Sequence, residues 1–240
     1  VVKQYFMPEF SSETAMLQDL LGLMEKFGVI VSFNGKSYDL PLLRSRFVLN
    51  RLKQNLDSKM HIDLLHPSRR LWKNIYGDSS LQGLEQALLN FRRTDDIPGS
   101  LIPGKYFEFL QTMEFAPLKK IFQHNVMDIL SMMAILIIFE NIISHPTRAV
   151  HKFDKLGLLK SYLGVHWIDE LVETANKLSS RSKNKDDFEI QLFKSMVQKK
   201  YDTKQNAADT WIDLLGNYSI FDPIVYIELA KYYEHELREY

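Results

Sequence analysis

Three polar residues are of the types that catalyse hydrolysis, and they lie in or beside two short stretches of the chain. Asp39 follows the stretch VIVSFNGKSY, and Asp128 ends the stretch QHNVMD, in which His124 lies four residues earlier. Carboxylates bind hard divalent cations, and the near-neutral pKa of an imidazole suits it to taking a proton from water. The three residues are therefore candidates for metal-assisted hydrolysis with a general base.

The stretch around Asp39 predicts a strand, a turn and a helix. The β-branched run VIV is followed by the polar turn NGKS, and the apolar residues after Asp39 then recur at helical spacing. Ligands of open α/β sheets bind beyond the carboxyl ends of the strands, where Asp39 would lie. The alternative is that Asp39 is only the N-cap of the helix, with Pro41 in its first turn.

The stretch Gln123 to Phe139 predicts a helix that is apolar around most of its circumference and therefore largely buried. His124 and Asp128 share one side if the helix reaches back far enough. An alternative makes Asn125 the N-cap, with Asp128 at the third helical position. A carboxylate beside apolar surface is costly to ionise without compensation, and a divalent cation is one compensation.

Two motifs carry a resemblance to a known family. N-G-x-x-x-D-x-P-x-L at Asn34 to Leu43 and H-N-x-x-D at His124 to Asp128 resemble the second and third motifs of the DEDD 3′ to 5′ exonucleases, which have the ribonuclease H-like fold. The intervening blocks resemble the YprB-type predicted exonuclease group, so that the likeness covers Val1 to Ile143. These blocks are Met60 to Trp72, Gly77 to Leu89 and Asp95 to Leu110.

The resemblance implies two-metal-ion phosphodiester hydrolysis with Mg²⁺ or Mn²⁺. Asp39 and Asp128 would be the metal-binding carboxylates of motifs two and three, and His124 would orient or deprotonate the attacking water. The substrate would be the 3′ end of single-stranded DNA or RNA. The residues expected to contact it are Asn34, Gly35, Lys36 and Arg44.

The sequence departs from the family pattern in two ways. Three residues separate His124 from Asp128, which is the spacing of the subfamily that uses Tyr in place of His. The Asp-x-Glu pair of motif one is missing, and the resemblance implies that it belongs on a strand before Val1. Glu9 and Glu13 are the nearest acids, but they lie at the start of a helix. We therefore expect this polypeptide to have half a metal site and little or no activity, whereas the intact protein would be active.

Composition limits the classes of protein and site. The 240 residues include no Cys, which rules out thiolate metal sites and agrees with a reducing, cytoplasmic compartment. The longest apolar stretch, Ile129 to Phe139, is too short to span a bilayer, so no membrane partner is expected. Thirty basic and thirty acidic residues give no overall field for nucleic acid. A local basic group without an intervening acid either holds phosphates or lines a solvated helix face; it comprises Arg44, Arg46, Arg51 and Lys53.

The order of elements predicts an α/β fold with a mostly parallel, ribonuclease H-like sheet and flanking helices. Expected strands lie at Val1 to Met7, at Val29 and at Lys59 to Leu65. On the last of these, Asp63 either anchors an Arg, caps the turn, or binds a metal with the two neighbouring histidines. Ser80 is expected to cap a helix, and the aromatic residues after Pro103 either enter the core or stack bases.

The character of the chain changes after His145-Pro146. We expect a ribonuclease H-like domain over residues 1–146 and an all-α, tetratricopeptide-like domain over residues 147–240, whose surface binds a partner protein or guides substrate. The expected helices are Trp167 to Leu178, Asp187 to Lys200, Ala207 to Leu215 and Pro223 to Leu237.

Two functions therefore compete at this point. The first is a metal-dependent exonuclease with a helical accessory domain. The second is a non-catalytic interaction module, in which a degenerate nuclease fold is kept for its helical surface. Metal binding that depends on Asp39 and Asp128 distinguishes them.

Overall fold

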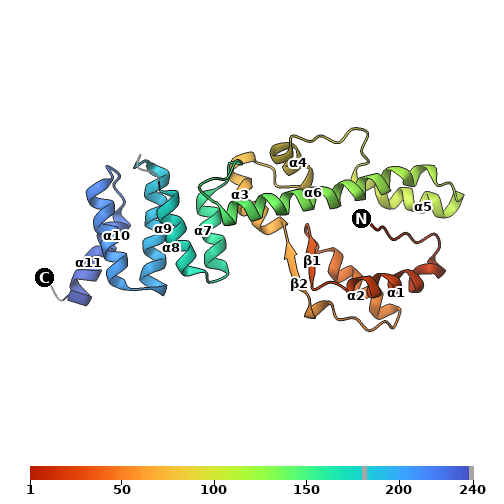
Figure 1. Cartoon of the computed structure of the whole chain (residues 1–240), viewed down its shortest axis with the longest axis horizontal. Helices are drawn as coiled ribbons and strands as arrows, with labels where there is room; N and C mark the ends of the chain where they lie inside the picture. Colours follow the sequence, from red (N-terminus) through yellow and green to blue (C-terminus); the bar gives the residue numbers. More distant parts are fainter. Residues whose placement is uncertain (180–182, 238–240) are drawn as a thin grey trace. The chain divides into compact units, whose positions relative to one another are not determined.

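A computed structural model describes residues 1–179 and 183–237, and the chain divides into two compact units (Figure 1). The first unit contains residues 1–69 and 78–139, and the second contains residues 70–77 and 140–240. Helices α3 (Leu65–Tyr76) and α6 (Lys119–Ser144) contribute residues to both.

The first unit contains a small parallel sheet of two strands, β1 (Val29–Ser32) and β2 (Met60–Asp63). Val29 pairs with Met60 and Ser32 pairs with Asp63, so the two strands end together. The sheet is parallel as predicted, but it has two strands where more were expected in the part of the chain that the structure describes.

The prediction of a strand at residues 1–7 was wrong, because this segment pairs with no strand among residues 1–179 and 183–237 and contacts neighbouring helices through its side chains. The amide of Gln4 donates to the carbonyl oxygen of Phe122 on α6 at 2.9 Å. The ring of Phe6 packs edge-on against Phe109 and Phe122, with centroids 5.3 and 5.4 Å away. The Tyr and Phe content that predicted a strand is used for aromatic packing instead.

Short helices complete the first unit. Helices α1 (Glu13–Met24) and α2 (Asp39–Leu49) pack together through Leu17, Leu40 and Phe47. Ser80 caps α4 (Leu81–Leu89) as predicted, accepting the N–H of Gly83 at 3.1 Å. The other elements are α5 (Ile102–Thr112) and the single turns η1 (Phe10–Ser12), η2 (Leu56–Ser58), η3 (Gly99–Leu101) and η4 (Ala116–Leu118). Of the aromatic residues on α5, Phe109 is buried, as the core interpretation required, whereas Phe107 is exposed.

Helix α6 is longer than predicted and less buried. Ile135 and Ile142 are buried, but Leu130 and Met133 are at least half exposed. By length and composition, the segment Ala116–Ser144 is long and apolar enough to cross a membrane. The sequence predicted no such span, because the uninterrupted apolar stretch Ile129 to Phe139 is too short. Core helices of soluble proteins have the same length and composition.

The second unit is a series of helices in which each contacts the next (Figure 1). They are α7 (Lys155–Gly164), α8 (Ile168–Leu178), α9 (Lys185–Tyr201), α10 (Lys204–Asn217), α11 (Pro223–Tyr232) and η5 (Tyr233–Leu237). The sequence predicted all of these helices except α7, with α11 and η5 as a single helix. Trp211 and Ala208 of α10 lie in a core with Phe188 of α9 and Val225 of α11. Side-chain N-caps fix four of these helix starts; they are Asp154, Asn184, Thr203 and Asp222.

Candidate active site

Asp39, His124 and Asp128 line one cavity of about 700 Å³ in the first unit. Asp39 comes from the start of α2, after the loop that leaves β1, and the other two residues come from α6. Helix α1 and strand β1 supply apolar walls, including Leu20 and Ile30. Folding therefore brings together the three residues that the sequence singled out for chemistry.

The carboxylate of Asp39 does not cap its helix. Tyr38 occupies the N-cap position without a side-chain cap, and Asp39 is the first residue of α2. Asp39 is exposed, and within residues 1–179 and 183–237 its carboxylate has no hydrogen-bond or ion-pair partner. The capping interpretation was therefore wrong, and both oxygens of this carboxylate are available to a ligand.

The loop before Asp39 is anchored by Asp63 at the end of β2. The buried Asp63 carboxylate accepts the backbone N–H groups of Asn34, Lys36 and Leu65 at 2.8, 2.9 and 3.1 Å. Burial raises the pKa of the Asp63 carboxyl, but these three donors outweigh it and leave the pKa below its ordinary value. Asp63 thus caps the turn, which was one of its predicted roles.

Gly35 is required where the loop approaches both the strand and Asp39. A Cβ atom at this buried position would lie 2.5 Å from Ser32 Oγ and 3.3 Å from Asp39 Oδ2. The hydroxyl of Ser32 is itself held 2.8 Å from His61 Nε2. A side chain at residue 35 would therefore clash with Ser32, and only glycine lets the loop lie this close to the strand.

The predicted substrate contacts differ in their surroundings. Gly35 lines the cavity, and Asn34 and Lys36 flank it in the anchored loop. Arg44 forms an ion pair with Asp57. Arg46, from the same basic group, donates to Glu13 at 2.6 Å, so these two arginines are matched by acids from outside their own helix. Substrate binding by Asn34, Gly35, Lys36 and Arg44 stays a prediction.

His124 and Asp128 lie one turn apart on the same side of α6, with Nε2 and Oδ2 3.4 Å apart. The helix begins at Lys119, so Asn125 is not its N-cap and Asp128 is not in its first turn. Both parts of that capping interpretation were therefore wrong. The charge of Asp128 is therefore not compensated by the N-terminal end of the helix dipole or by a capping role.

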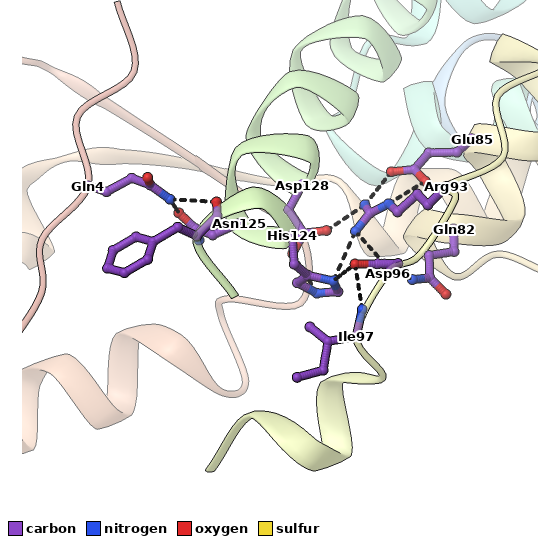
Figure 2. Close-up of polar contacts among 10 residues, drawn as sticks. Gln4, Gln82, Glu85, Arg93, Asp96, Ile97, His124, Asn125 and Asp128 are labelled. Carbon is purple, nitrogen blue, oxygen red and sulfur yellow. Dashed lines mark hydrogen bonds and ion pairs between the residues drawn. The ribbon is translucent and has the colours of Figure 1, made fainter. Parts of the chain in front are cut away.

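Arg93 is the group that compensates Asp128, and the sequence reasoning missed it. Its side chain is 6% exposed, and Nη2 lies 2.6 Å from Asp128 Oδ1 (Figure 2). It also binds Glu85, which is 1% exposed, with Nε 2.8 Å from Oε2. Burial lowers the pKa of Arg93, but the hydrogen bonds to Glu85 and Asp128 outweigh it and leave the pKa above its ordinary value. The sequence does contain a signal for this pair: Glu85 lies within the largely apolar run LEQALL, and an acid buried there requires a basic partner.

Asp96 contacts the other side of His124 (Figure 2). Its Oδ1 atom lies 2.8 Å from His124 Nδ1 and also accepts the N–H of Ile97 at 2.9 Å. Burial raises the pKa of the Asp96 carboxyl, but the hydrogen bond from His124 and the charges around it leave the pKa below its ordinary value. His124 is thus held between the carboxylates of Asp96 and Asp128.

The residues present suit a hard divalent cation by their chemistry. In the part of the chain that the structure describes, no group of three or more His, Cys, Asp or Glu side chains is arranged to hold a metal. Mg²⁺, however, is commonly held by one or two carboxylates together with waters and substrate phosphates. Asp39 brings to the cavity two oxygens that have no partner in the described part of the chain, and Asp128 uses Oδ1 for Arg93.

Comparison with known proteins places this site in a family. The family model RNase_H_2, of the RNase_H superfamily, matches residues 1–139. The chain belongs to the RNase_H_2 family. The matched residues include Asp39, His124 and Asp128, so the cavity lies within the RNase_H_2 part of the chain.

Two curated proteins are similar to this RNase_H_2 chain. "Uncharacterized protein YprB" of Bacillus subtilis (strain 168) is 31% identical over 243 residues, covering all of this chain and 58% of YprB. DNA polymerase 1 of Aeropyrum pernix is 28% identical over 167 residues, covering 62% of this chain and 16% of the polymerase. No solved structure matches significantly. The likeness to the YprB-type group is thereby confirmed, and the chain spans a little over half of the Bacillus protein.

Proposed function

We propose that this chain is the nuclease part of a metal-dependent 3′ to 5′ exonuclease of DEDD type. The observation that carries the proposal is the meeting of Asp39, His124 and Asp128 at one cavity of an RNase_H_2 chain. The similarity to a DNA polymerase supports a substrate that is nucleic acid. We take that substrate to be the 3′ end of single-stranded DNA or RNA.

Asp39 and Asp128 would hold the metal, which we propose to be Mg²⁺ or Mn²⁺. When bound, such an ion supplies positive charge that polarises the phosphate and acidifies a nearby water. The carboxylate of Asp39 has no competing partner within residues 1–179 and 183–237, which supports its assignment as a metal ligand. Asp128 shares its charge with Arg93, so a cation must bind there beside the guanidinium.

His124 would accept the proton of the attacking water. The water oxygen bonds to phosphorus, its proton passes to Nε2 of His124, and the P–O3′ bond breaks. The released nucleotide then carries the phosphate, and the shortened strand gains a 3′-hydroxyl after its oxygen takes up a proton. The loop anchored by Asp63 presents Asn34, Gly35 and Lys36 near Asp39, and Lys36 with Arg44 would offset phosphate charge.

We further propose that residues 1–146 form the nuclease domain and residues 147–240 form a tetratricopeptide-like helical domain. The consecutive helix contacts and the shared core of α9, α10 and α11 support the second assignment. Such a domain would bind a partner protein or guide the strand, in the cytoplasm.

The test is a cleavage assay with the whole encoded protein that contains this chain. The substrates are single-stranded DNA and RNA labelled at the 5′ end, with Mn²⁺ or Mg²⁺ present. We expect a ladder of products shortened from the 3′ end, and a loss of at least about 100-fold for Asp39→Asn and for Asp128→Asn. If the protein does not cleave, or if both variants cleave normally, the chain is better explained as a non-catalytic interaction module.

A further inference from the structure

We propose that Asp96 is a positioning residue for His124, which keeps the ring hydrogen on Nδ1 and the lone pair on Nε2. The catalytic role of this tautomer rests on the proposed function, in which His124 accepts a proton from water. Its structural basis is independent of that function. It lies in the contacts that converge on a single ring nitrogen.

Two groups approach His124 Nδ1 and require opposite positions of the ring hydrogen (Figure 2). Asp96 Oδ1 lies 2.8 Å from Nδ1 and can only accept a hydrogen, because its carboxylate is ionised. Arg93 Nη1 lies 3.2 Å from the same nitrogen and can only donate. A neutral imidazole can satisfy one of these two groups but not both.

The distances favour Asp96 as the partner. A hydrogen on Nδ1 gives a charge-assisted hydrogen bond of 2.8 Å. The two unfavourable contacts that it leaves are longer: a donor facing a donor at 3.2 Å, and the Nε2 lone pair 3.4 Å from Asp128 Oδ2. A hydrogen on Nε2 would instead place the Nδ1 lone pair against a carboxylate oxygen at 2.8 Å. Repulsion grows as the separation falls, so the second arrangement is the more costly.

The surroundings fix both members of the pair. Asp96 Oδ1 is held by the N–H of Ile97 at 2.9 Å, and Asp96 Oδ2 lies 3.3 Å from Arg93 Nη1. Arg93 therefore has acceptors other than His124, since it also binds Glu85 and Asp128. The side chains of Asp96 and His124 are 17% and 13% exposed, so water competes little for their contact.

The consequence is a lone pair on Nε2, the nitrogen that faces Asp128. Nε2 lies 3.4 Å from Asp128 Oδ2, and both residues line the cavity. A water near these atoms would therefore find a proton acceptor already in the correct tautomer. Without Asp96, Arg93 is left as the partner of Nδ1, and the ring hydrogen moves to Nε2.

The first test reads the tautomer directly and needs no catalysis. Histidine ring spectra of the ¹⁵N-labelled chain are recorded at a pH at which the ring is neutral, and His124→Gln identifies the His124 signals. We expect hydrogen on Nδ1 in the wild-type chain and on Nε2 in Asp96→Ala. Hydrogen on Nε2 in the wild-type chain overturns the proposal, even if Asp96→Ala fails to fold.

The matched control is the neighbouring acid. Asp95 has a side chain that is 80% exposed and pairs with Lys120 rather than with His124. Asp95→Ala should leave the His124 tautomer unchanged. If Asp95→Ala and Asp96→Ala change the tautomer alike, the effect belongs to the loop and the proposal is wrong.

The second test uses the intact protein with a single-stranded oligonucleotide. We expect Asp96→Ala to lower kcat by about 10- to 100-fold, with KM changed less than about twofold, and Asp95→Ala to change neither. If His124→Gln and Asp128→Asn abolish cleavage while Asp96→Ala keeps its kcat, this proposal fails and the proposed function stands. If neither of the first two variants affects cleavage, the proposed function itself fails.

Discussion

The two sides of the cavity hold their carboxylates in different ways. Asp39, at the start of α2, is placed by backbone: a loop anchored on Asp63 and a close approach at Gly35. Asp128, on α6, is placed by the side chain of the buried Arg93. The carboxylate of Asp39 can therefore bind a ligand at no cost to stability, whereas the carboxylate of Asp128 also helps to stabilise the fold.

The largest effect should come from removing the basic residue on the α6 side. Arg93→Met leaves Glu85 buried without its partner, because the Glu85 side chain is 1% exposed. We expect the free energy of unfolding, measured with urea, to fall by about 3–5 kcal/mol. Arg92→Met is the control, since Arg92 is exposed and should change stability by less than about 0.5 kcal/mol. Equal losses for the two variants would show that the Arg93 cluster does not stabilise this side.

The next effect should come from the backbone side, at Gly35. Gly35→Ala forces a Cβ atom against Ser32, and we expect it to cost about 1–3 kcal/mol in the same unfolding measurement. Gly22→Ala is the matched control, because it lies within α1 with open space around it. That substitution should stabilise the chain by about 0.5–1 kcal/mol. A neutral Gly35→Ala would mean that the loop is not closely packed here.

The comparison between the carboxylates is sharpened by neutralising each in turn. Asp128→Asn removes a charged partner of Arg93 and should cost about 1–3 kcal/mol of unfolding free energy. Asp39→Asn loses no contact within residues 1–179 and 183–237, so it should change stability by less than about 0.5 kcal/mol. A large loss from Asp39→Asn would contradict the view that its carboxylate is free for a ligand.

The smallest effect concerns the pH dependence of the loop anchor. The pKa of Asp63 is held below its ordinary value, so its contribution to stability is present above that ordinary value. The contribution should be lost as the pH falls through the lowered pKa. We expect the unfolding free energy to decrease less steeply with acidification in Asp63→Asn than in the wild-type chain. Identical pH dependence of the two proteins would exclude Asp63 as an ionised anchor.

The sequence was informative where a local pattern determines the structure. Helical spacing located α8 to α11, and the polar turn after VIV located β1 and Asp39. The meeting of Asp39 with Asp128 followed from a family resemblance rather than from spacing, because nothing local in either stretch refers to the other.

The partners of the catalytic candidates were not predictable in the same way. Arg93 and Asp96 lie in a loop with no periodicity, and they reach α6 only through the tertiary fold. Residues 1–7 have strand composition, yet Phe6 packs in an aromatic cluster instead of joining the sheet. In both cases long-range contacts overrode the local preference.

The central claim is that Asp39 and Asp128 hold one divalent cation, and calorimetric titration of the chain with Mn²⁺ tests it most directly. Asp39→Asn is the decisive variant, because it should fold as the wild-type chain does. Asp169→Asn, which changes an exposed acid in the first turn of α8, is its matched control. We predict that Asp39→Asn and Asp128→Asn each weaken Mn²⁺ binding by at least about tenfold and that Asp169→Asn leaves it unchanged. Equal Mn²⁺ affinity in the wild-type chain, Asp39→Asn and Asp128→Asn would contradict the claim.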